Sequence, residues 1–156
     1  MKKLYFMVAI LVALGLSGCT GTDSTTSGTN SNLIGTWSNG CEVDGTNDSI
    51  RLILTFSSTN IDVLEKSYDG PNCDETKVTN TYTETMTYNI GSSTHYSNGT
   101  SAKEMDRTRE GDTYFFMYSI ENNILYTSDG DATNDGSTAD KRANIYDFTS
   151  GMKKVS

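Results

Sequence analysis

The stretch 77–90 constrains the fold most strongly, because its residue types alternate for fourteen residues. A period of two puts successive side chains on opposite faces of a β-strand, whereas a helix would spread them around its surface. One side carries Thr79, Thr81, Thr83, Thr85 and Thr87, and the other carries Val78, Tyr82, Met86, Tyr88 and Ile90. This stretch therefore predicts one long strand with a polar face and a mainly apolar face.

Seven further segments show the same pattern in shorter form, bounded by turn-forming residues. They span residues 33–41, 49–57, 60–68, 101–109, 112–121, 124–128 and 142–155. Consecutive strands of this kind usually pair with each other, and eight of them can close and remove exposed edges. We therefore expect an all-β fold, a single antiparallel up-and-down β-barrel of about eight strands. Residue 33 would enter at the bottom, and the loops after residues 41, 68, 109 and 128 would lie at the top.

The N-terminus has the features of a secretory signal. Two lysines precede an apolar run at 4–16, which is too short to span a bilayer stably. Leu16-Ser17-Gly18-Cys19 then resembles the lipobox of bacterial lipoproteins. The resemblance implies cleavage before Cys19 and acylation of Cys19, and several acyl chains anchor a protein stably. Thr20, in place of Asp, favours the cell outer membrane, with the protein facing the periplasm or the cell surface.

Three regions follow from this organisation. Residues 1–18 form the signal peptide, 19–32 a lipidated tether rich in Ser, Thr and Gly, and 33–156 the barrel domain. After cleavage the chain has 10 basic and 20 acidic side chains, a formal charge of 10 − 20 = −10. Such acidity argues against nucleic acid as a partner and is compatible with a basic protein partner.

Gly35-Thr36-Trp37 at the start of the first strand resembles the G-x-W motif of lipocalins and related calycins. The resemblance implies a lipocalin-like barrel in which Trp37 has a structural role near the barrel floor. In that family an arginine of the last strand stacks on the tryptophan. Arg142 would begin the last strand at the wrong end for this contact.

Two cysteines remain once Cys19 is lipidated, namely Cys41 and Cys73. An even pair in an exported domain predicts a disulfide, and the barrel order puts both residues at the top. The loop of about 33 residues gives roughly 3 to 4 kcal/mol of stabilisation in the chain-entropy model. Since the chain has one histidine, a Cys/His zinc site is disfavoured.

Acidic side chains gather in the predicted top loops, which would make one negative rim. They are Glu42, Asp44, Asp48, Asp69, Asp74, Glu75, Glu110, Asp112, Asp129, Asp131, Asp135 and Asp140. Such a rim would select cations or a basic protein, although Asp is also common in turns for local reasons.

The loop 129–136 offers Asp129, Asp131 and Asp135 as calcium ligands, but Arg142 stands where an EF-hand needs a bidentate Glu. A looser calcium site and a solvated loop both remain open.

We find no catalytic motif in the sequence, and we expect neither enzymatic activity nor a cofactor. His95 lies in a Gly/Ser/Asn loop with no partner at a recognisable spacing. Glu65 and Glu84 would point inward if their strands keep register, and burial would raise their pKa values. Six aromatic side chains are expected to point into the barrel. They would bind a small apolar or aromatic ligand there, or fill the interior themselves. The six are Tyr82, Tyr88, Tyr114, Phe116, Tyr118 and Tyr126.

Two functions follow from these observations. The first is a membrane-anchored envelope lipoprotein with a non-catalytic binding role, holding such a ligand in the barrel. The second is a protein-interaction module, of the inhibitor or adhesion type, that acts through the acidic top loops.

Overall fold

The computed structural model describes residues 32–43, 47–147, 149 and 151–156. The predicted signal peptide, the lipobox with Cys19, and the tether up to residue 31 lie outside the described residues. The strands are β1 (Gly35–Ser38), β2 (Glu42–Val43), β3 (Ser49–Phe56), β4 (Asn60–Tyr68), β5 (Val78–His95), β6 (Ser101–Arg109), β7 (Asp112–Glu121), β8 (Ile124–Asp129), β9 (Ile145–Tyr146) and β10 (Met152–Lys154). Two short 3-10 helices, η1 (Glu75–Lys77) and η2 (Ala139–Lys141), lie in the connections.

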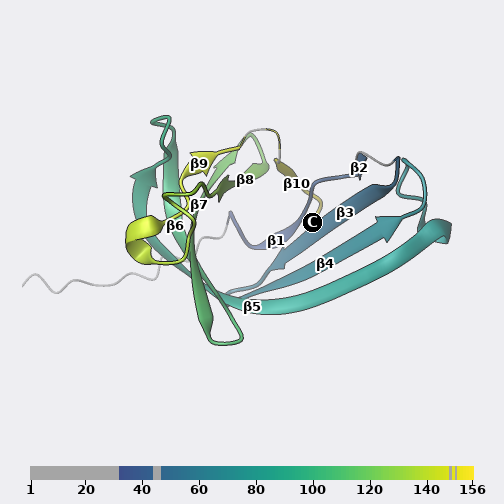
Figure 1. Cartoon of the computed structure of the whole chain (residues 1–156), viewed down its shortest axis with the longest axis horizontal. Helices are drawn as coiled ribbons and strands as arrows, with labels where there is room; N and C mark the ends of the chain where they lie inside the picture. The colour runs from purple at the N-terminus through teal and green to yellow at the C-terminus, as the bar shows by residue number, and fades with distance from the viewer. Residues whose placement is uncertain (1–31, 44–46, 148, 150) are drawn as a thin grey trace, which may run out of the picture.

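Eight strands close into an antiparallel barrel (Figure 1). Their order is β1-β10-β8-β7-β6-β5-β4-β3, and β3 pairs back onto β1 along Gly35 to Ser38. β2 continues the edge of β3, and β9 pairs with β8 off this path. The predicted all-β fold with a closed eight-stranded antiparallel barrel is confirmed.

The first predicted strand, 33–41, is shortened to β1 and is followed by the separate short strand β2, and the last, 142–155, is broken into β9 and β10. Between β1 and β2 the side chain of Asn39 accepts the Leu52 amide at 2.8 Å, which replaces a bond of the backbone ladder. The segment predicted as the strand 142–155 does not begin as a strand at Arg142. The backbone there crosses β7, where the Ala143 amide donates to Phe115 O at 3.0 Å. Only β10, at the end of this segment, enters the barrel wall.

β5 is longer than predicted and continues to His95. A register shift between Ile90 and Ser93 lets it follow the β6 partner further. A Cβ on Gly91 would stand 2.6 Å from Glu104 Oε2, so the glycine permits this close approach. β5 pairs with β4 through residues 78–87 and with β6 through residues 87–95. The first half of β5 therefore has a strand neighbour on one side.

Apolar side chains fill the barrel at the end where the chain enters, as expected from the alternation of each strand. This filled end consists of Leu33, Trp37, Leu54, Phe56, Ile61, Tyr88, Met105, Tyr118, Leu125 and Met152. The indole of Trp37 is fully buried and donates to Leu33 O at 2.8 Å. The Tyr88 hydroxyl donates to Ser57 O at 2.7 Å, which ties β5 to the β3–β4 turn.

Lys154, and not Arg142, is the cation that covers Trp37. β1 and β10 pair Trp37 with Lys154, and the lysine Nζ lies 5.2 Å from the ring centroid. The same ammonium donates to Asn32 O at 3.1 Å. The last strand therefore places a cation on the tryptophan of the first, at the point where the barrel closes.

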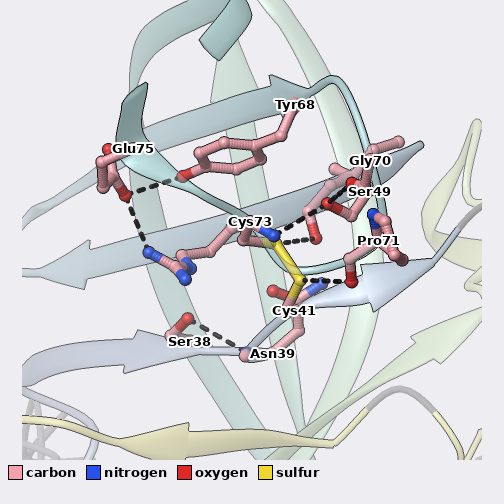
Figure 2. Close-up of a disulfide and its surroundings, with 12 residues drawn as sticks. Ser38, Asn39, Cys41, Ser49, Tyr68, Gly70, Pro71, Cys73 and Glu75 are labelled. Atoms are coloured by element: carbon pink, nitrogen blue, oxygen red, sulfur yellow. Dashed lines mark hydrogen bonds and ion pairs between the residues drawn. A yellow bond between two sulfur atoms is a disulfide. The ribbon is translucent and has the colours of Figure 1, made fainter. Parts of the chain in front are cut away.

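The predicted disulfide between Cys41 and Cys73 is present, with the two Cα atoms 5.8 Å apart. It joins the break between β1 and β2 to the connection from β4 to β5 (Figure 2). Ser49 lies beneath this connection and is fully buried. Its hydroxyl donates to Gly70 O at 2.7 Å and accepts the Cys73 amide at 3.0 Å. Two kinds of link thus hold the connection on the outside of β3.

Glu75 makes a third link on the same outer surface. Its carboxylate accepts from Arg51 at 2.8 Å, from Lys66 at 2.7 Å and from the Tyr68 hydroxyl at 2.9 Å. The hydrogen bonds from Lys66 and then Tyr68 hold the pKa of Glu75 below its ordinary value. Glu75 is thus engaged in holding the β4–β5 connection.

Candidate functional site

The inner faces of β5, β6 and β7 continue past the filled end and form an open cleft. The five residues that line it, which we call the mouth cleft, are Met86, Arg107, Arg109, Tyr114 and Phe116. Its volume is about 240 Å³. β6 and β7 pair Arg107 with Tyr114 and Met105 with Phe116, so these side chains share the face that Met105 presents to the core.

The cleft is open because the barrel wall is complete only around the filled end. β1 is four residues long and pairs with the second half of β3. β6 begins to pair with β5 at Thr87, so residues 78–86 of β5 pair with β4 alone. Beyond the core, the inner face of β3, β4 and β5 thus has no complete wall opposite it. Figure 1 shows β3, β4 and the first half of β5 extending away from the rest of the barrel. The mouth cleft lies next to the point on β5, at Thr87, where its pairing passes from β4 to β6.

Arg107 is the most unusual residue of the mouth cleft. Its guanidinium carbon lies 3.6 Å from the centroid of the Phe116 ring. Its Nε is buried and has no hydrogen-bond partner among the described residues. Burial lowers the pKa of Arg107 to about 10, so the side chain remains charged at neutral pH. Arg107 as a whole is half-buried, and no ion pair among the described residues neutralises its guanidinium. A partly desolvated charge without a counterion is unfavourable, and such a group attracts an anion.

Arg109, two residues along β6, is already paired. Its Nε lies 3.3 Å from Glu84 Oε1 on β5, and the Glu84 side chain is 15% exposed. The Glu84 charge raises the pKa of Arg109, and the hydrogen bond from Tyr82 to Glu84 raises the pKa of Tyr82. The guanidinium of Arg109 also lies 5.8 Å from the Tyr114 ring. The cleft therefore contains one neutralised arginine and one that has no such partner.

The six aromatic residues predicted to converge in the barrel divide into four groups. Tyr114 and Phe116 line the mouth cleft, and Tyr88 and Tyr118 are buried in the filled end. Tyr82 is on the inner face but is 45% exposed, because it lies on the part of β5 that has no opposite wall.

Tyr126 is on the outer face, and its predicted convergence with the others is wrong. Leu125 beside it faces the core, so alternation turns Tyr126 outward. Its ring packs on Tyr146 at 5.2 Å, and Tyr146 packs on Tyr96 at 4.8 Å. Tyr96 and Tyr146 belong, with Ala102 and Met117, to a second apolar cluster outside the barrel.

Glu65 and Glu84 keep the register that the sequence predicted. β4 pairs Val63 with Glu84 and Glu65 with Tyr82, and Val63 packs on the core, so both glutamates lie on the inner face. Glu84 is held by Arg109, as described above. Glu84 thus lies beside the mouth cleft, whereas Glu65 lies opposite Tyr82 on the extended part of the sheet.

The acidic loops do not gather into one rim. Figure 1 places the β4–β5 connection at one end of the longest axis and η2 near the other, beyond β6. The 129–144 segment is held on β7, where the Phe115 amide donates to Gly136 O at 2.9 Å. Arg142 fixes it further through Asp106 at 2.7 Å and Glu104 at 3.6 Å. The length of β5 separates loops that a shorter barrel would bring together.

The predicted calcium ligands are used within their own loop. The Asp131 carboxylate accepts the amides of Thr133 and Asn134 at 2.7 Å each, and that of Asp135 accepts from Ser137. These hydrogen bonds lower the pKa values of both aspartates. The described residues contain no group of three or more Asp, Glu, His or Cys side chains placed to share a metal ion, and Asp129 joins none.

A larger cleft, of about 510 Å³, lies near the filled end. Leu33, His95, Lys103, Tyr118 and Glu121 are among its lining residues. Of the side-chain atoms that the structure describes, the buried one without a partner is Arg107 Nε, and it is not in this cleft. The mouth cleft is therefore the stronger candidate for a binding site.

Sequence reasoning missed Met86, Arg107 and Arg109 as site residues. The signal was present in the run Met105-Asp106-Arg107-Thr108-Arg109, where the two arginines follow the apolar Met105 at intervals of two residues. On a strand this spacing puts them on the core-facing side. The polar character of 101–109 hid this feature.

Comparisons with protein-family models, curated proteins and solved structures find no match for this chain. Within the described residues, no helix is long and apolar enough to cross a membrane.

Proposed function

We propose that the protein is an envelope lipoprotein, anchored through acyl chains on Cys19, whose barrel binds a small molecule in the mouth cleft without catalysis. The observation that carries the proposal is an open cleft with three apolar or aromatic walls, Met86, Tyr114 and Phe116, at the end of a filled barrel. Ligand sites are concave and mostly apolar, with few polar groups. The filled end would supply the rigid base that such a site needs.

Two further observations support the proposal. The lipobox Leu16-Ser17-Gly18-Cys19 follows a basic head and an apolar run, as in bacterial lipoproteins. Gly35-Thr36-Trp37 resembles the G-x-W motif of lipocalins and related calycins, and Lys154 lies over the Trp37 ring at 5.2 Å. A resemblance of this kind favours a binding role over a catalytic one.

Native mass spectrometry of the protein extracted from its own membranes tests both parts of the proposal. We expect an acyl mass on Cys19, lost in Cys19→Ala, and a further small-molecule mass. An unmodified Cys19 would refute the anchor.

A neutral probe, N-phenyl-1-naphthylamine, then tests the cleft directly. The chain from Thr20 onward retains every described residue, and Trp37 emission shows whether each variant is folded. We expect the probe to bind, and Tyr114→Ala to weaken binding at least fivefold. The control Tyr146→Ala removes a ring from the outer cluster and should leave binding unchanged. Failure of the probe to bind would refute the mouth cleft as a site for apolar molecules.

A further inference from the structure

We infer that the ligand of the mouth cleft carries one anionic group on an apolar or aromatic body, and that the guanidinium of Arg107 receives the anion. The inference rests on the proposed function of the cleft, and it adds the chemical class of the ligand. It follows from three features of the structure.

The first feature is the unsatisfied charge of Arg107. Its Nε is buried and unpartnered, and none of the ion pairs among the described residues includes it. Arg142, whose side chain is 11% exposed, is a buried arginine with a structural role and serves as a comparison. It bonds to Asp106 and to the carbonyls of Met105 and Phe116, and it pairs with Glu104. Arg107 has no comparable set of hydrogen-bond and ion-pair partners, as expected for an arginine whose partner is a bound anion.

The second feature is the charge balance of the cleft. Two arginines, Arg107 and Arg109, line the cleft, and Glu84 beside it is committed to Arg109 at 3.3 Å. One positive charge therefore remains on Arg107. Guanidinium N–H groups match carboxylate and phosphate oxygens in pairs, and these charge-assisted bonds are strong in a partly desolvated site.

The third feature is the surface around Arg107. The guanidinium lies over the Phe116 ring, which holds it in place, and Met86 and Tyr114 complete the walls. A cleft of about 240 Å³ is larger than a bare oxyanion needs. An apolar body would cover Met86 and the two rings while its anion meets Arg107, so the whole lining would be used.

Two probes that differ in charge test the inference. 1-Anilinonaphthalene-8-sulfonate carries a sulfonate on the same ring system as the neutral N-phenyl-1-naphthylamine. We expect the wild-type chain from Thr20 onward to bind the anionic probe more tightly than the neutral one. Arg107→Met should weaken the anionic probe at least tenfold and leave the neutral one within about twofold, whereas Arg107→Lys should recover part of the loss.

The controls separate charge at the site from net charge and from folding. Arg51→Met makes the same change in net charge on the outer face, beside Tyr68, and should leave both affinities unchanged. Urea unfolding followed by Trp37 emission confirms that each variant is folded. 1-Naphthoate should displace the anionic probe, and inorganic phosphate at the same concentration should not.

Each outcome has one meaning. If the neutral probe does not bind the wild type, the proposed function fails, whether or not the anionic probe binds. If both bind and Arg107→Met affects them equally, the cleft binds small molecules but the anionic class is wrong. If phosphate displaces the probe as well as 1-naphthoate does, the site takes a simple oxyanion and the apolar body is wrong.

Discussion

Loss of the Cys41–Cys73 disulfide should be the most damaging change outside the core. The sequence separation of 32 residues gives a stabilisation of about 3.7 kcal/mol at 25 °C in the chain-entropy model. Residues 33–156 number 124, and a domain of this size unfolds with an entropy of about 0.26 kcal/mol/K. The Cys41→Ala/Cys73→Ala variant should therefore melt about 14 °C lower than the wild type.

Urea unfolding measured by Trp37 emission is the assay, since the fully buried single tryptophan will change its emission when the barrel opens. Reduction of the wild type by dithiothreitol should lower the free energy of unfolding by nearly the same amount as the double variant. Any difference in the free energy of unfolding between the reduced wild type and the double variant measures the packing contribution of the Cys73 side chain, which is 4% exposed. A loss below about 1 kcal/mol in both would refute the loop-entropy argument. It would mean that Ser49 and Glu75 hold the β4–β5 connection without help from the disulfide.

Two further predictions concern buried groups that can ionise. Burial raises the pKa values of Tyr96 and Tyr118 to about 12, while both titrate near 10 when unfolded. The contribution of these two tyrosines to the free energy of unfolding should therefore be constant below about pH 9 and be lost between about pH 10 and 12. Absorbance at 295 nm and urea midpoints will show this, and Tyr118→Phe should reduce the pH dependence; a midpoint independent of pH up to 12 would contradict it. Arg142→Met should lower the free energy of unfolding by about 2 kcal/mol, because it leaves Asp106 and two carbonyls without their donor. Arg51→Met removes the ion pair with Glu75 on the outer surface and should change the free energy of unfolding by less than about 1 kcal/mol. Equal losses in the two variants would argue against a buried role for Arg142.

The strands could be predicted from the sequence because alternation is a local property. The stretch 77–90 shows this, since the strand begins within one residue of the predicted start and differs mainly at its C-terminal end, which extends to His95. The disulfide could also be predicted, because two cysteines remain beside the predicted lipobox and the predicted strand order put Cys41 and Cys73 at the same end. By contrast, β10 takes its place from its neighbours, Trp37 on one side and Leu125 on the other.

The face of Tyr126 shows where period-two reasoning stops. Ile124 and Leu125 are both apolar, so alternation cannot choose which parity faces the core. The pairing of Leu125 with Ile120 and Met152 makes the choice and turns Tyr126 outward. The mouth cleft was likewise beyond local patterns. It depends on where the pairing of β5 passes from β4 to β6, and this sets which part of the barrel is walled.

Methyl NMR of ¹³C-methionine protein tests the central claim most directly, because the described methionines sample each region of the fold. Met86 lines the mouth cleft, Met105 and Met152 belong to the filled end, and Met117 belongs to the outer cluster. Titration with 1-anilinonaphthalene-8-sulfonate should shift the Met86 methyl strongly, and leave Met152 and Met117 unchanged. A shift at Met117 without one at Met86 would place binding outside the barrel, and would contradict the account of the mouth cleft as the functional site.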